Sequence, residues 1–157
     1  MTATRYTPLA SDLVVTYRNG GPDANGHAPE RRTSDGSGVP CRHCLKQVAA
    51  GNDYLVLAHR PFPDAQPYAE VGPIFVHADA CPAFHGETHR PPILTGSPRF
   101  LVRGYGHDHR IVYGTGDVIE TDAVDRYAGG LLERAEIAYV HVRSARNNCY
   151  QCRIDRA

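Results

Sequence analysis

Two short motifs of cysteine and histidine constrain this chain more than any other feature. The first is Cys41-x-x-Cys44 and the second is His77-x-x-x-Cys81. Two thiolates three positions apart in a tight turn can both reach one ion at about 2.3 Å. Side chains four positions apart on a helical turn share one face. We therefore expect Cys41, Cys44, His77 and Cys81 to hold one metal ion, and the donor set favours zinc.

The segment between the two motifs holds two strand-like runs, at 54–60 and 72–77. A cysteine knuckle, a hairpin and the start of a helix follow one another in a treble-clef zinc site, and residues 78–84 are predicted to form the short helical turn. Four protein ligands leave no open position, so the predicted zinc is structural rather than catalytic. The simpler interpretation without a metal makes Cys81 a core cysteine and His77 a histidine at a strand end.

A third motif, Cys149-x-x-Cys152, leaves the choice of ligands open. In a regular strand over 148–154 these two cysteines point to opposite faces and cannot share an ion. Cys152 then faces the core together with Tyr150. If the segment instead forms a knuckle, both cysteines join the first Cys-x-x-Cys pair in a tetrathiolate site.

Charge and hydropathy argue against several classes of protein. Lys and Arg together number 17, as do Asp and Glu, so the net charge is zero. A general binder of nucleic acids or membrane surfaces needs a basic excess. No run approaches the roughly 18 apolar residues of a membrane span, and residues 1–18 lack the pattern of a signal peptide. We therefore expect a cytoplasmic protein whose five cysteines stay reduced and serve metal or thiol chemistry.

The order of segments predicts a single α+β domain with a small, mostly antiparallel sheet and one or two helices. Residues 1–38 are expected to supply a strand over 9–17 and then a mobile loop rich in Gly, Pro and Ser, and residues 39–157 the main domain. Further strands are predicted over 99–105, 110–120, 138–144 and 148–154, and a helix over 123–135 with Asp122 as its N-cap.

Arginine side chains gather near the C-terminus and form a second candidate site. In the alternating segment 139–143, His141 and Arg143 share one face of the predicted strand. Together with Arg146 and Arg103 they offer donors for an anion such as a carboxylate or a phosphate. The plainer interpretation is a solvated outer face of the sheet.

Six longer segments carry a resemblance to a known family. They are CRHCL (41–45), AHRPFP (58–63), PYAEVGPIFVHADAC (67–81), VRGY (102–105), IVYGTG (111–116) and AYVHVRSARNNCYQC (138–152). Together they resemble an uncharacterised bacterial family, the domain of unknown function 1203. The resemblance covers nearly everything from residue 39 to the end, and implies that the chain before it is an accessory stretch. It implies no activity, substrate or catalytic residue.

Three functions of different classes follow from these features. The first is a zinc-stabilised, non-enzymatic domain that binds a small anionic ligand or a protein partner. The second is a thiol-dependent enzyme with Cys149 as the nucleophile, because neighbouring arginines lower the pKa of a thiol. The third is a nucleic-acid-binding zinc module, which the zero net charge disfavours. The chain has no P-loop, GxSxG or HExxH motif, so we prefer the first.

Overall fold

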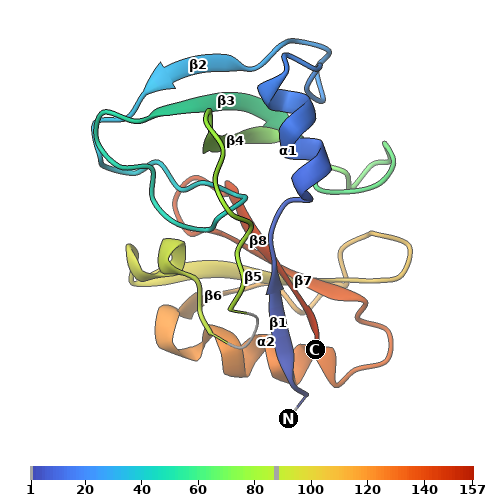
Figure 1. Ribbon diagram of the computed structural model, residues 1–157. Helices are drawn as coiled ribbons and strands as arrows, with labels where there is room; N and C mark the ends of the chain where they lie inside the picture. The colour runs from blue at the N-terminus through green and yellow to red at the C-terminus, as the bar shows by residue number, and fades with distance from the viewer. Residues whose placement is uncertain (1, 87–88) are drawn as a thin grey trace.

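The computed structural model describes residues 2–86 and 89–157, and it has the predicted α+β architecture with two antiparallel sheets and two helices (Figure 1). The larger sheet has the strand order β1 (Thr4–Thr7), β8 (Tyr150–Arg156), β7 (Tyr139–Ser144), β5 (Arg99–Tyr105) and β6 (Asp117–Glu120). The smaller sheet has the order β2 (Glu30–Thr33), β3 (Asp53–His59) and β4 (Gly72–His77). The helices are α1 (Ser11–Arg18) and α2 (Val124–Leu132), with 3-10 turns at Pro92–Thr95 and Thr121–Ala123. None of the helices in the described part of the chain is long and apolar enough to cross a membrane.

The first core lies between the five-stranded sheet and α2, which runs across one face of that sheet (Figure 1). Alternate residues of β5, β7 and β8 point into it, as the period of a strand requires. The helix contributes one apolar face to the same core. The fully buried members include Val102, Val140, Val142, Cys152 and Ile154 from the strands and Val124, Ala128 and Leu132 from α2.

The second core lies in the other half of the molecule, where α1 and the three-stranded sheet meet the first cysteine motif. Val14 and Tyr17 of α1 are buried in it. The strands contribute Leu55, Leu57, Ile74 and Val76, and the knuckle region contributes Val39, Cys41, Cys44 and Val48. The molecule therefore has two separate cores, and a part of the chain must connect them.

The second face of the five-stranded sheet is covered, which corrects the interpretation of a solvated outer face. Tyr105, Tyr139 and His141 are all buried there. Phe62, from the proline-rich connection between β3 and β4, packs 5.2 Å from the ring centroids of both Tyr105 and His141. The polar residues of this face consequently lie in a crevice between the two sheets.

The strand predicted over 9–17 is wrong, because this segment forms α1. The β-branched pair Val14 and Val15 favours a strand, yet Val14 and Tyr17 are the buried pair and are three positions apart, the spacing of one helix face. Val15 is 51% exposed. The N-terminal strand lies earlier, at Thr4–Thr7, and pairs with β8 at the edge of the larger sheet.

The loop predicted over 19–38 is wrong over part of its length, because Glu30–Thr33 forms β2, which pairs with β3, whereas the rest is irregular chain. The carboxylate of Asp23 fastens the segment by accepting hydrogen bonds from the backbone N–H groups of Asn25, His27 and Ala58, at 2.9, 3.1 and 2.9 Å. Polar contacts to the backbone thus replace the apolar burial that the segment lacks.

Three further expectations need correction. No helix forms over 78–84, since Pro82 disfavours helical backbone angles at the residue before it. Only the end of the strand predicted over 110–120 forms, as β6. Asp122 does not cap α2, because a 3-10 turn precedes the helix and the cap position is Ala123; the Asp122 carboxylate instead pairs with Arg90 at 3.2 Å.

Candidate metal centre

The first cysteine motif forms a tight knuckle. The N–H of Cys41 donates to the carbonyl of Lys46 at 2.9 Å, and the N–H of Leu45 donates to the carbonyl of Cys41 at 2.9 Å. Leu45 closes this turn with a φ of +55°, a left-handed conformation that a non-glycine residue rarely adopts. The turn brings both thiols to its inner side, and the Leu45 side chain inserts into the first core while Cys41 and Cys44 lie in the second.

The second motif lies beside the knuckle because β4 runs along it. His77 is the last residue of β4, and Cys81 follows in irregular chain. A bridge joins Cys41 to Phe75 of β4, and the N–H of His77 donates to the Cys41 sulfur at 3.2 Å. A strand end therefore supplies the second ligand pair, in place of the helical turn that the treble-clef pattern predicted.

The four predicted side chains come together in one cluster. The ligand atoms of Cys41, Cys44, His77 and Cys81 all lie within 4.8 Å of one another, so they are positioned to hold a metal ion. The sulfurs of Cys41 and Cys81 are 4.0 Å apart, and the Cys44 sulfur lies 3.4 Å from Nδ1 of His77. A tetrahedral site with metal–sulfur bonds of about 2.3 Å has sulfurs about 3.8 Å apart. The spacing of the cluster is close to that value.

The thiols of the cluster interact strongly with one another. Hydrogen bonds from the thiols of Cys44 and Cys81 lower the pKa of Cys41 far below its usual range, despite the opposing effect of burial. The hydrogen bond between Cys44 and Cys41 raises the pKa of Cys44. A thiolate on Cys41 is thus stabilised within the cluster. Metal ligands must be thiolates, so this stabilisation favours a cation at the same position.

Two cationic or polar side chains outside the ligand set support Cys81. Nη2 of Arg18 donates to the Cys81 sulfur at 3.1 Å, and Nε of the same guanidinium donates to the carbonyl of His77 at 3.0 Å. Nδ1 of His43 lies 3.2 Å from the same sulfur, and its Nε2 lies 2.8 Å from the hydroxyl of Ser11. Contacts of this kind orient metal ligands and tune their basicity.

The alternative pair, Cys149 and Cys152, lies outside this cluster. Cys152 is buried in the first core, where burial raises the pKa of its thiol. Cys149 is half-buried just before β8, with its sulfur 3.7 Å from the carbonyl of Asn147. The predicted face of Tyr150 is wrong: a register shift between β7 and β8 turns Tyr150 into the second core, away from Cys152.

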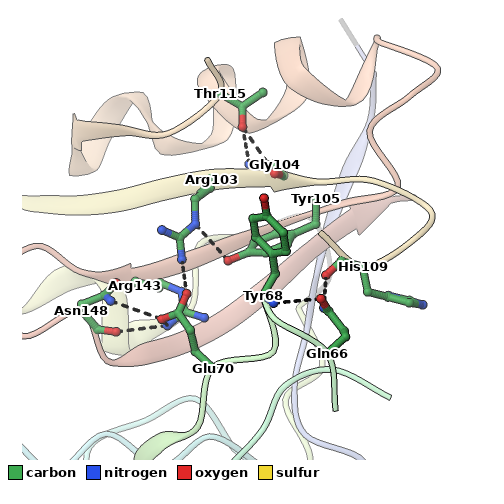
Figure 2. A network of polar contacts seen from close by, with 10 residues as sticks. All are labelled: Gln66, Tyr68, Glu70, Arg103, Gly104, Tyr105, His109, Thr115, Arg143 and Asn148. Carbon is green, nitrogen blue, oxygen red and sulfur yellow. Dashed lines mark hydrogen bonds and ion pairs between the residues drawn. The ribbon is translucent and has the colours of Figure 1, made fainter. Parts of the chain in front are cut away.

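The structure brings some of the predicted anion-binding residues together and separates others. Glu70 lies between Arg103 and Arg143, with carboxylate oxygens 3.0 Å from Nη2 of Arg103 and 3.6 Å from Nη1 of Arg143 (Figure 2). His141 is buried under the neighbouring aromatic rings. Arg146 lies in the exposed turn between β7 and β8 and lines a surface cavity that includes none of the other three predicted residues.

A comparison with known protein families identifies the family of this chain. A family model described as "Protein of unknown function (DUF1203)" matches residues 38–156. The chain belongs to this family. No curated protein and no solved structure matches it. The DUF1203 match spans both cysteine motifs of the metal cluster, whereas β1, α1 and β2 precede it.

Sequence reasoning did not find two residues that shape the metal cluster. Arg18 belongs to no motif, and His43 is an unassigned position inside Cys-x-x-Cys; each acts through a partner distant in the sequence. Arg18 is 63 positions from Cys81, for example. Arg18 is the basic residue in the last turn of α1, a position that a sequence can indicate only when the helix itself is predicted.

Proposed function

We propose that this protein is a non-enzymatic domain stabilised by one structural zinc ion, and that it binds a small anionic ligand or a protein partner. The observation that carries the zinc proposal is the cluster of Cys41, Cys44, His77 and Cys81 within 4.8 Å. Three thiolates and one imidazole are a common donor set of structural zinc sites. Four protein ligands complete a tetrahedral shell, so no position remains for a substrate.

A structural role also fits the position of the knuckle between the two cores. The Arg42 side chain, in the middle of the knuckle, is buried and donates from Nε to the carbonyl of Tyr150 at 2.8 Å. The carbonyl of Arg42 accepts the N–H of Leu9 at 3.0 Å. With Leu45 in the other core, the knuckle connects β8, the N-terminal segment and the small sheet. An ion here would fix the joint of the molecule.

None of the five cysteines forms a disulfide with another described residue, which supports a reducing compartment, so we propose a cytoplasmic location. The zero net charge disfavours nucleic acid as the ligand.

Elemental analysis of untagged protein tests the zinc proposal. We expect about one zinc per chain, and we expect Cys44→Ser to lose the ion and to unfold in large part, because structural zinc binding contributes on the order of 10 kcal/mol to folding. The matched control is Cys149→Ser, which changes a cysteine outside the cluster and is expected to keep both zinc and fold. A preparation that contains no metal and remains fully folded would contradict the proposal.

A further inference from the structure

A small cavity of about 210 Å³ opens in the crevice between the two sheets. It lies where the end of β3 and the start of β4 face the turn between β7 and β8. Its apolar wall is formed by Pro61, Val71 and Pro73. Its polar wall is formed by side chains that include His59, Glu70, Arg143, Asn148 and Cys149. The metal cluster shares none of these residues, so this cavity is a separate place in the fold.

Arg143 is the unusual residue of this cavity. Its side chain is only 5% exposed. Nη1 donates to the carbonyl of Asn148 at 3.2 Å and lies 3.6 Å from Glu70 (Figure 2). Nε and Nη2 are buried and have no hydrogen-bond partner among the described residues. These two nitrogens form one edge of the guanidinium, with parallel N–H groups. An unpaired buried donor of a charged group is destabilising, so a ligand that reaches this edge would be favoured.

The charges around the cavity favour an anion. Burial and the neighbouring Arg42 and Arg60 lower the pKa of His59, at the cavity wall, to about 4. Burial together with Arg143, Arg153 and Arg103 lowers the pKa of His141 well below its usual range. Both histidines are therefore neutral near pH 7. Burial is the main cause in both cases, and the arginines add to it, which is consistent with cationic groups near the cavity.

We propose that this cavity binds a small carboxylate, held by the Nε and Nη2 edge of Arg143, with the amide of Asn148 beside it. This inference rests on the ligand-binding half of the proposed function and names the class of its ligand. A carboxylate matches the guanidinium edge because two parallel N–H groups meet two coplanar oxygens. The volume is below the 300–1,000 Å³ of typical ligand sites, and the wall of Pro61, Val71 and Pro73 suits a short apolar tail.

Glu70 acts in this proposal as a competing carboxylate at the rim. Its side chain is 40% exposed, and one of its oxygens already contacts Arg103 at 3.0 Å. Its other oxygen is too far from Arg143 for a direct hydrogen bond and accepts a long one, 3.5 Å, from Asn148. The ligand would take the edge of Arg143 that Glu70 leaves unpaired. Removing the Glu70 charge should therefore strengthen binding.

Calorimetric titration of the full, metal-loaded chain with acetate, propionate and butyrate tests the proposal at constant ionic strength, with sulfate as the comparison anion. We expect one saturable site per chain for at least one carboxylate. Arg143→Lys, which keeps the charge and loses the planar edge, should weaken binding at least tenfold. Arg146→Lys is the matched control and should bind as the parent does. Glu70→Gln should bind at least threefold more tightly.

A second measurement keeps the proposal testable if Arg143→Lys does not fold. Cys149 lines the cavity, so a saturating carboxylate should slow its alkylation by iodoacetamide at least threefold in the parent chain. Absence of saturable binding, sulfate binding as tight as the best carboxylate, or an unchanged Cys149 rate would each overturn the assignment. Zinc content measured on the same samples separates the two proposals: one zinc without carboxylate binding defeats this inference alone.

Discussion

At the scale of single residues, the metal cluster depends on side chains that are not ligands. Arg18 uses two nitrogens of one guanidinium on two different parts of the site, the sulfur of Cys81 and the carbonyl of His77. It therefore fixes the relative position of the two ligands of the second motif. A positive charge beside a thiolate would also offset part of the negative charge that three thiolates would bring to a bound ion.

Replacing Arg18 should weaken metal binding without removing a ligand. We expect Arg18→Met to lower zinc affinity by about 10- to 100-fold, the usual effect of losing an outer contact to a metal ligand. Competition with a chromophoric chelator measures this affinity. The control is Arg32→Met, which removes an exposed arginine that pairs with Glu30 on the edge strand β2. Equal affinities for the two variants would show that Arg18 does not support the site.

At the scale of elements, the predictions that proved correct are those with strong local patterns. Strands β3, β4, β5, β7 and β8 were all predicted within a few residues of their observed bounds. Their apolar residues alternate or run continuously, because each strand borders a core. β2 was missed because its four residues, Glu30–Thr33, are all exposed and carry no apolar pattern. Its formation depends on pairing with β3, which is tertiary information.

The two candidate sites also differ in how far local sequence patterns predict them. The metal cluster was predictable because ligand spacing within each motif is a local property, and only the juxtaposition of two motifs needed the fold. The cavity was not predictable, since Glu70 and Arg143 lie 73 positions apart in the sequence and meet only across the crevice. Of the predicted arginines, Arg143 lines the cavity, whereas Arg146, only three positions later, lines a different one.

The helical form of residues 11–18 makes a sharp prediction at this scale, because neighbouring valines have opposite environments. Val14 is fully buried in the second core and Val15 is 51% exposed. We expect Val14→Ala to lower the free energy of unfolding by about 2 kcal/mol, from lost burial and the cavity that remains. Val15→Ala should change it by less than about 0.5 kcal/mol. Denaturant titration of the holo-protein measures both, and equal losses would contradict the helical assignment.

At the scale of the whole molecule, buried polar groups hold the two halves together, one from the knuckle and one from β3. The guanidinium of Arg42 reaches the backbone of β8, and His59, at the end of β3, packs its ring 5.8 Å from that of Tyr150. Both groups are buried. The buried junction holds a neutral histidine and an arginine bonded to carbonyl oxygens. Protonation of His59 would add a second buried positive charge there, so we expect acid to destabilise the junction.

The direction of this sensitivity follows from His59. Burial, Arg42 and Arg60 lower its pKa to about 4 in the folded chain, against about 6.5 when unfolded. The unfolded chain therefore binds the proton first as the pH falls. The contribution of neutral His59 is complete above pH 6.5 and is lost progressively between about pH 6.5 and 4, at about 1.4 kcal/mol for each pH unit.

A histidine-free variant at this position should therefore be less sensitive to acid. Between pH 7.5 and pH 5 we expect the parent chain to lose about 2 kcal/mol more unfolding free energy than His59→Gln does. Urea titrations of the holo-proteins at both pH values, with metal content checked at each, measure the difference. His85→Gln, which changes an exposed histidine, is the control and should follow the parent. If His59→Gln followed the parent as well, the acid sensitivity of the fold would originate from groups other than His59, because no other change separates the two proteins.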